Sequence, residues 1–416
     1  MIKKVLLIII DGLGDRLIKE FGNKTPLEAA KTPNLDMIAK KSLCGTMCAL
    51  GRGIRPGSDT SHLQILGYDP NIYYTGRGPI EVAGIGFELQ SGDIAFRGNF
   101  GTIDDDWNIV DRRAGRITNV SKFAKAIDGI EIDGVKFIVK PATAHRAGVV
   151  LRGKGLSANI TDNDPHVAGE KVLKVLPKDE TKEAYFTAEV INKFMKKSHE
   201  ILKELEINKE RKLNNELEAN FLLLRGAGIY PNNLEKFDSK FNYKKSACIA
   251  GGGLYKGIGA YLGMDIINVE GATALPNTNL DNKFKMAVNL LNNEINDFVF
   301  LHIKPTDSLG EDGNPIGKRD FIEKIDNSIK ILNDLDEETL IVITADHSTP
   351  CELKQHSADP VPIMICGRGV RSDDVKEFGE RSCTKGGLGF IEGKDIMPII
   401  LDIQGKLKLI GAWINK

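Results

Sequence analysis

The sequence opens with MIKKVLLIIIDG (residues 1–12), in which an unbroken apolar run leads directly to Asp11 and Gly12. A strand that is buried on both faces is continuously apolar, whereas a half-buried strand alternates apolar and polar residues. The run is too short for a signal peptide, and no small-residue cleavage site follows it. We therefore predict a buried parallel strand at Lys4–Ile10, which is typical of an α/β sheet covered on both faces.

Segments of the same kind alternate with helical patterns in the later part of the chain. We expect strands at Ser246–Ala250, Asp265–Val269, Asp297–His302, Thr339–Thr344 and Pro362–Cys366, and helices at Asn34–Lys41, Asn282–Asn292, Phe321–Leu332 and Asp395–Ile403. Strands that alternate with helices favour a mainly parallel sheet with helices on both faces.

The middle of the chain has a different character. From Ala83 to Val150, short alternating runs such as GDIAFRGNFGTI are joined by Asp and Gly turns, as in an antiparallel sheet. Thr181–Leu205 has the apolar spacing of an amphipathic helix. A further helix is expected at Leu213–Leu224.

The length of 416 residues exceeds that of one ordinary core, so we expect two domains. The simplest arrangement is a discontinuous α/β domain, residues 1–82 and 244–416, with an α+β domain, residues 83–243, inserted into it. A formal net charge of −1 gives no electrostatic reason to expect nucleic acid or an anionic membrane as a partner. The six cysteines form no CxxC pair, which favours reduced thiols in a cytoplasmic protein.

Side chains that suit metal ions follow several of the predicted strands. Asp11 follows the first strand, Asp307 lies shortly after VFLHI, and Asp346-His347 follows LIVIT. In an open α/β sheet, ligands bind beyond the carboxyl ends of the strands. One Asp at a strand end is commonly a turn or cap residue, but several such ends together indicate a metal site. His356 precedes the next strand and is expected to join them.

Ser58 lies in RPGSDTSHLQ, where Pro-Gly predicts a tight turn and the residues after it predict a helix. Serine there suits a plain helix cap. Close to metal ions, however, its hydroxyl would lose its proton far more easily, and the first amides of a helix bind phosphate. The pattern therefore indicates a two-metal site with a serine nucleophile, which is suited to moving phosphoryl groups.

The order of these motifs resembles the alkaline phosphatase superfamily, and within it the archaeal type of 2,3-bisphosphoglycerate-independent phosphoglycerate mutase. The motifs are DG at Asp11, GSDTSHL at Ser58, KPTD at Asp307, TADHSTP at Asp346-His347 and HSADPVP at His356, with GRGPIEVAG, DRRAGR, TDNDPH and EGATA between them. The resemblance covers essentially the whole chain. It implies an alkaline-phosphatase-like three-layer domain with a smaller inserted domain.

The resemblance also implies a ligand set for each metal ion. Asp11, Asp346 and His347 would bind one ion, with Ser58 as a fourth ligand and as the residue that is phosphorylated. Two divalent ions are implied, and no 2,3-bisphosphoglycerate is required.

The second ion would be bound by Asp307, His356 and the residue four positions after Asp307. The family has His at that position, in the pattern D-x-x-G-H-D-G, whereas this chain has Glu311 in DSLGEDG. A carboxylate oxygen makes the site harder, so Mn²⁺ or Mg²⁺ is expected, with Co²⁺ or Zn²⁺ as other candidates.

The inserted domain is expected to bind the phosphoglycerate carboxylate and hydroxyls. The substrate-binding candidates are Arg112, Arg113, Arg116, Arg146 and His166, together with Lys256 in GGGLYKGIG, which would contact the phosphoryl group near Ser58. An arginine fork pairs with a carboxylate or phosphate through two parallel hydrogen bonds. Asp164 and His145 are the candidates for proton transfer to and from the substrate oxygens.

The resemblance implies that 3-phosphoglycerate and 2-phosphoglycerate are interconverted through a phosphoserine, as a step of glycolysis and gluconeogenesis. Two alternatives remain open. One is another member of the superfamily, such as a phosphopentomutase or a metal-dependent phosphatase. The other is an inactive sensor of phosphoglycerate or metal, if Glu311 disrupts one metal site. The oligomeric state is not predicted.

Overall fold

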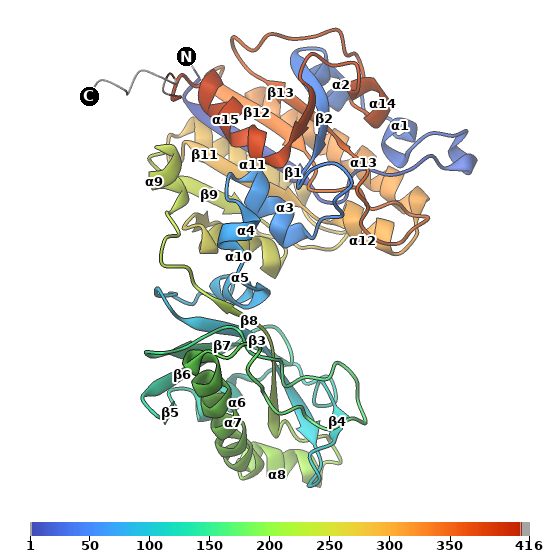
Figure 1. Cartoon of the computed structure of the whole chain (residues 1–416). Helices are drawn as coiled ribbons and strands as arrows, with labels where there is room; N and C mark the ends of the chain where they lie inside the picture. Colours follow the sequence, from blue (N-terminus) through green and yellow to red (C-terminus); the bar gives the residue numbers. More distant parts are fainter. Residues whose placement is uncertain (1, 408, 410–416) are drawn as a thin grey trace. The chain divides into compact units, whose positions relative to one another are not determined.

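The protein, as seen in a computed structural model that describes residues 2–407 and 409, forms two compact units (Figure 1). The first comprises residues 1–72 and 235–416, and the second comprises residues 73–234. One unit is therefore interrupted in sequence by the other.

The first unit is built on an eight-stranded sheet with the order β10-β9-β11-β1-β12-β13-β2-β14. Its strands are β1 (Lys4–Ile10), β2 (Ser42–Cys48), β9 (Ser246–Ile249), β10 (Asp265–Ile266), β11 (Phe298–Ile303), β12 (Thr339–Thr344), β13 (Val361–Cys366) and β14 (Gly389–Glu392). Only β13 runs antiparallel to its neighbours β12 and β2. The predicted mainly parallel sheet is confirmed.

Helices cover both faces of this sheet. Every residue of β1 and of β11 is buried, and because successive side chains point to opposite faces, both faces must be covered. The helices of the unit are α1 (Pro26–Ala29), α2 (Pro33–Ala39), α3 (Ser58–Ile65), α9 (Phe237–Phe241), α10 (Gly253–Tyr261), α11 (Leu280–Asn292), α12 (Pro305–Glu311), α13 (Pro315–Ile329), α14 (Glu380–Cys383) and α15 (Gly393–Ile403), and α4 (Pro70–Tyr73) ends at the boundary of the unit.

The second unit contains an antiparallel sheet with the order β4-β3-β7-β6-β5, in which β8 also pairs with β3. Its strands are β3 (Ile94–Ile103), β4 (Ile109–Asp111), β5 (Glu131–Ile132), β6 (Val135–Pro141), β7 (Arg146–Arg152) and β8 (Phe221–Ile229), and its helices are α5 (Arg77–Ala83), α6 (Ser121–Ile127), α7 (Lys182–Lys203) and α8 (Glu206–Leu213). The predicted α+β character of this part of the chain is confirmed.

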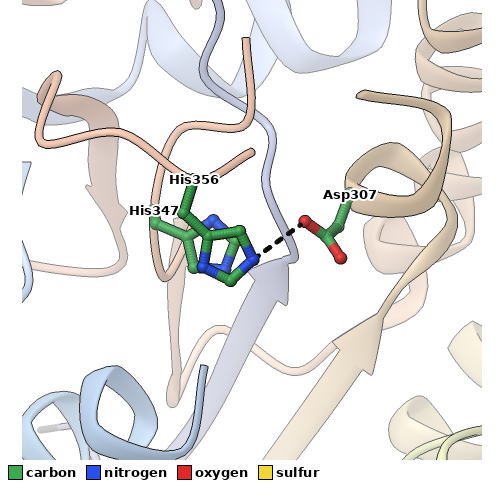
Figure 2. Close-up of side chains that lie close together, drawn as sticks. All are labelled: Asp307, His347 and His356. Carbon is green, nitrogen blue, oxygen red and sulfur yellow. Dashed lines mark ion pairs between the residues drawn. The ribbon is translucent and has the colours of Figure 1, made fainter. Parts of the chain in front are cut away.

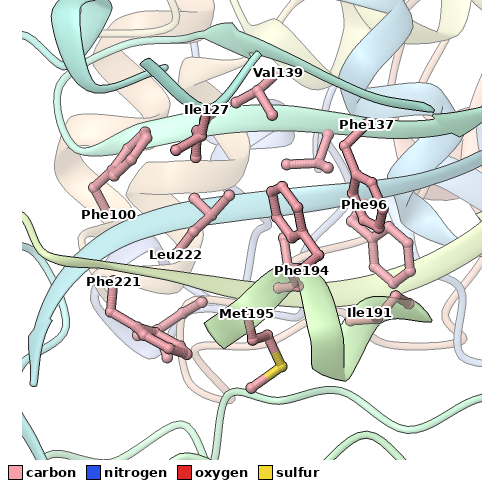
Figure 3. Close-up of a cluster of buried hydrophobic side chains, with 14 of the residues drawn as sticks. Phe96, Phe100, Ile127, Phe137, Val139, Ile191, Phe194, Met195, Phe221 and Leu222 are labelled. Carbon is pink, nitrogen blue, oxygen red and sulfur yellow. The ribbon is translucent and has the colours of Figure 1, made fainter. Parts of the chain in front are cut away.

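The second unit has its own aromatic core (Figure 3). The rings of Phe137 from the sheet and Phe194 from α7 stack in parallel with their centroids 4.0 Å apart. Phe96, Phe100 and Phe221 are buried in the same cluster. The apolar face of α7 therefore anchors this helix on the sheet.

The two units begin and end at other residues than the domain boundaries expected from the sequence. Residues 73–82 were expected in the first domain, yet α5 packs on β3 and β8 of the second unit. Gly78 permits this packing, because a Cβ atom there would lie only 2.0 Å from the carbonyl oxygen of Ala95. At the other junction, residues 235–243 belong to the first unit.

The helix predicted at Leu213–Leu224 is wrong. Helix α8 ends at Leu213, and β8 begins at Phe221. Residues 221–224, FLLL, are buried in β8 and pair with β3, so tertiary burial decided the conformation of this apolar run. The strand β2 was not predicted at all.

All six cysteines are free, and all except Cys366 are buried. Within residues 2–407 and 409, no helix combines the length and the apolar character that crossing a membrane requires.

Candidate metal centre

The carboxyl ends of three adjacent strands bring the acidic residues of the site together. The strands lie in the order β11, β1, β12, and they run parallel to one another. Asp11 directly follows β1, Asp346 follows β12 with one residue between, and Asp307 lies in the first turn of α12 after β11. Asp11, Asp307 and Asp346 are all buried.

Asp11, Asp346 and His347 form the first candidate metal group, with ligand atoms that all lie within 4.8 Å of one another. The Nε2 atom of His347 is 3.4 Å from Oδ1 of Asp11 and 3.1 Å from Oδ2 of Asp346. The Oγ atom of Ser58, the first residue of α3, is 3.2 Å from the same Nε2 atom. The predicted start of a helix at Ser58 is confirmed.

Asp307, His347 and His356 form the second candidate group (Figure 2). The Nε2 atom of His356 is 3.5 Å from Oδ1 of Asp307, and the two imidazole rings stack with centroids 3.6 Å apart. The other ring nitrogen of His356, Nδ1, is 2.9 Å from the carbonyl oxygen of Pro56. When Nδ1 donates this hydrogen bond, Nε2 is left as a lone-pair donor to a cation.

His347 belongs to both groups, which the sequence did not suggest. Burial lowers the pKa of His347, but the charges of Asp346 and Asp11 outweigh burial and raise that pKa to about 9. Burial and the charge of Asp346 raise the pKa of Asp11. The pKa of Asp346 is lowered, because the His347 charge overcomes the effect of burial.

These residues fit divalent cations. Oδ1 of Asp11 and Oδ2 of Asp346 are buried and form no hydrogen bond of good geometry among the described residues, although the His347 ring lies within ion-pair distance of both. Buried carboxylate oxygens are costly unless they are paired or bind a metal ion. A donor set of carboxylates and imidazoles is one that divalent transition metals and zinc use.

Glu311 lies outside both groups. It is the last residue of α12, one helical turn after Asp307, and its side chain is exposed. Although the residue is exposed as a whole, partial desolvation of its carboxyl, and then the nearby Asp307 charge, raise the pKa of that carboxyl. Its role as a ligand stays a prediction.

Several further side chains contact the ligands, and sequence reasoning missed them. The Tyr255 hydroxyl donates to Oδ2 of Asp11, and the Tyr255 ring stacks on His302 with centroids 3.4 Å apart. The Lys304 ammonium is 2.7 Å from Oδ2 of Asp307 and 3.6 Å from Oδ2 of Asp11. Lys304 lies inside the KPTD motif and Tyr255 inside GGGLYKGIG, so both were adjacent to residues already singled out.

Lys256 donates to Oδ1 of Asn268 at 2.9 Å, and its contact with a phosphoryl group stays a prediction. In the second unit, Arg112 binds Asp164 through two hydrogen bonds, Nε to Oδ1 at 3.1 Å and a terminal nitrogen to Oδ2 at 2.6 Å. Although burial opposes it, this pairing lowers the pKa of Asp164. The His166 amide also donates to Asp164.

Positive charge gathers around the remaining predicted residues of the second unit. Burial first, and then the charges of Arg146, Arg113 and Arg97, lower the pKa of His145 to about 4. Arg225, which was not predicted, lies 3.3 Å from Nδ1 of His166. Arg116 is exposed in a turn, with a positive φ of 60°.

Comparisons with known proteins identify the protein class to which the chain belongs. Residues 3–403 match the Metalloenzyme superfamily, in agreement with the candidate metal groups. The 2,3-bisphosphoglycerate-independent phosphoglycerate mutase of Methanococcus aeolicus is 49% identical over 98% of this chain and 100% of its own length.

Two solved structures are similar over nearly the whole chain. The PH0037 protein from Pyrococcus horikoshii has a TM-score of 0.82 and 40% identity, covering 99% of this chain and 100% of its own. The cofactor-independent phosphoglycerate mutase from Thermoplasma acidophilum has a TM-score of 0.77 and 38% identity, with coverages of 96% and 99%. The chain belongs to the archaeal-type 2,3-bisphosphoglycerate-independent phosphoglycerate mutases, which confirms the predicted resemblance.

Proposed function

We propose that the chain interconverts 3-phosphoglycerate and 2-phosphoglycerate through a phosphoserine at Ser58. The observation that carries this proposal is the place of the Ser58 hydroxyl, 3.2 Å from Nε2 of His347, the residue common to both candidate metal groups. A hydroxyl so close to metal ligands, at the N-terminus of a helix, is suited to attack a phosphoryl group.

Two divalent cations would be bound by residues of the two groups. Asp11, Asp346 and His347 would bind one, and Asp307 and His356 the other, with Glu311 as an added ligand; His347 belongs to both groups of candidate ligands. Bound there, the cations would neutralise charge on the phosphoryl group and lower the pKa of the Ser58 hydroxyl. Mn²⁺ or Mg²⁺ is the expected ion.

The reaction proceeds in two balanced displacements. The Ser58 hydroxyl gives up its proton and its Oγ bonds to phosphorus, the phosphorus bond to the substrate oxygen breaks, and that oxygen takes up a proton. Glycerate then reorients, and its other hydroxyl gives up a proton and bonds to phosphorus. The bond between Ser58 Oγ and phosphorus breaks, and Oγ takes up a proton. The phosphoryl group is passed on without hydrolysis, so water must be excluded while glycerate is free.

The second unit would supply the residues that bind the glycerate carboxylate and hydroxyls. Burial first, and then the charges of Arg146, Arg113 and Arg97, lower the pKa of His145, and this concentration of arginine charge supports an anion site there. Arg112, Arg113, Arg146 and His166 are assigned to the substrate, while Asp164 and His145 are assigned to proton transfer. Such an enzyme would act in glycolysis and gluconeogenesis in the cytoplasm.

The test is a coupled assay with 3-phosphoglycerate and enolase, on Mn²⁺-loaded protein without 2,3-bisphosphoglycerate. A chelated sample and a free-phosphate assay run in parallel. Metal-dependent formation of 2-phosphoglycerate with little free phosphate is expected. Release of phosphate as the main product would favour a phosphatase, and no turnover with any metal would favour a sensor.

A further inference from the structure

A fully buried lysine lies behind the candidate metal centre. Lys318 of α13 has no exposed surface, and its ammonium group donates three hydrogen bonds. The acceptors are the Gly14 carbonyl oxygen at 3.0 Å, Oδ2 of Asp15 at 2.9 Å and the Thr349 carbonyl oxygen at 3.0 Å. A lysine ammonium has three N–H donors, so all of them are used.

The acceptors of Lys318 lie on the two loops that carry metal ligands. Gly14 belongs to the loop that starts with Asp11, and Thr349 belongs to the loop that starts with Asp346 and His347. The loops also contact each other directly, since the Thr349 amide donates to the Gly14 carbonyl at 3.0 Å. A Cβ atom on Gly14 would lie 2.0 Å from the Ser348 hydroxyl, so the loops approach closely.

Thr349 connects this junction to the ligands. Its hydroxyl donates to Oδ1 of Asp307 at 2.8 Å and lies 3.1 Å from Nδ1 of His347. Because the hydroxyl has one proton and gives it to Asp307, Nδ1 of His347 must be the donor in the second bond. Nε2 of His347 is then the ring nitrogen that faces the candidate metal groups, where a bound ion would take the place of its proton.

We propose that Lys318 is a positioning residue for the two-metal site. It holds the Asp11 loop and the His347 loop at one separation, and through Thr349 it orients Asp307 and His347. The inference rests on the metal assignment made under the proposed function. Its loss should weaken metal binding even in protein that is fully folded.

A second buried lysine provides a matched control. Lys4 in β1 is only 6% exposed and forms an ion pair of 2.8 Å with Asp336. Lys4 lies at the start of β1, whereas Asp11 follows its end. Lys4→Met therefore removes a buried ammonium from the same unit without changing the ligand loops.

The experiment is calorimetric titration of the full-length, chelator-stripped chain with Mn²⁺, together with a thermal unfolding scan of each variant. Lys318→Met is expected to weaken Mn²⁺ binding about tenfold or more, the usual range for residues behind metal ligands. Lys4→Met should bind Mn²⁺ within about twofold of the unsubstituted chain, the scatter expected for a distant site.

Lys318→Met leaves the Asp15 carboxylate buried without its partner, so the variant could fail to fold. Asp15→Asn combined with Lys318→Met removes both charges and the hydrogen bonds that the ammonium group donates to the two loop carbonyls. The double variant should fold and should still bind Mn²⁺ about tenfold more weakly, as expected when support behind metal ligands is lost.

Unchanged Mn²⁺ affinity in a folded Lys318 variant would overturn the positioning role alone. Equal losses in Lys318→Met and Lys4→Met would also overturn it, because the effect would then be one of general stability. If neither Lys318 variant folds, the positioning role is overturned as well, because Lys318 would then be needed for stability as a whole. If the unsubstituted chain takes up no Mn²⁺, the metal assignment of the proposed function fails as well.

Discussion

At the scale of single residues, His347 is the centre of the site. Both candidate metal groups include it, and the Ser58 hydroxyl lies beside its Nε2 atom. A nucleophile between two cations can exchange its proton for metal contacts and attack a phosphoryl group. The proposed mechanism therefore depends most directly on the Ser58 hydroxyl.

Ser58→Ala should lower kcat by at least about 10³-fold, as loss of a nucleophile typically does, while the fold is retained. Ser61→Ala is the matched control, because Ser61 lies on the same helix and its hydroxyl donates to the Gly57 carbonyl. Kinetics of the coupled assay measure both variants. Mutase activity near that of the unsubstituted chain in Ser58→Ala would refute a phosphoserine at this position.

Glu311 is the predicted ligand that lies outside both candidate metal groups, one helical turn beyond Asp307. If Glu311 binds the second ion, Glu311→Ala should weaken one of two Mn²⁺ binding steps by about tenfold and leave the other unchanged. The neighbouring exposed Asp312 provides the control substitution Asp312→Ala. Two unaltered steps in a Mn²⁺ titration of Glu311→Ala would remove Glu311 from the ligand set.

At the scale of elements, sequence patterns predicted those helices and strands whose conformation follows from their own residues. The apolar run of β1 and the segment of β12 were placed correctly, since a continuous apolar stretch of strand length, bounded by turn residues, favours a doubly covered strand. The same pattern failed at β8, because an apolar run beside a helix does not reveal whether a sheet will take it. Strand β2, SLCGTMC, has small and polar residues and is buried by its neighbours.

The candidate site was also predictable only in part. Residues at strand ends follow from topology, so Asp11, Asp307, Asp346 and His347 could be placed together. The contacts of Tyr255 and Lys318 could not, because each depends on how a helix packs against the loops. Arg97 of β3 and Arg225 of β8 lie opposite each other, and this proximity could not be predicted because it depends on the pairing of the two strands.

The packing of α11 on β11 gives a prediction for how the free energy of unfolding depends on pH. Lys283 of α11 is fully buried and donates to the His302 carbonyl at 3.1 Å, and burial lowers its pKa from 10.5 to about 8. Between those values the unfolded chain holds a proton that the folded chain has released. The free energy of unfolding should therefore rise with pH in this window, by on the order of 1 kcal/mol per pH unit.

Chemical denaturation from pH 7.5 to pH 10.5 measures this slope. Lys283→Met removes the titrating group and should flatten the profile relative to the unsubstituted chain. Identical slopes in the two proteins would contradict the lowered pKa of Lys283. The measurement is made on chelated protein, so that metal binding does not contribute to the pH dependence.

At the scale of the whole molecule, we expect different interactions to stabilise the two units. The first unit contains every residue of both candidate metal groups, and the second unit is one continuous segment with its own aromatic core. A ligand that binds only the folded state stabilises the unit that binds it, by about 2.7 kcal/mol at a hundred times its Kd. Metal removal should therefore affect the two units unequally.

We expect a fragment of residues 73–234 to fold alone and to unfold at the same temperature with Mn²⁺ or with chelator. In the full chain, Mn²⁺ should raise the unfolding temperature of one transition and leave a second one, matching the fragment, in place. Differential scanning calorimetry of both proteins resolves this. A Mn²⁺-dependent shift in the isolated fragment would show that residues of the second unit bind the metal, and the assignment of both ions to the strand ends of the first unit would then be wrong.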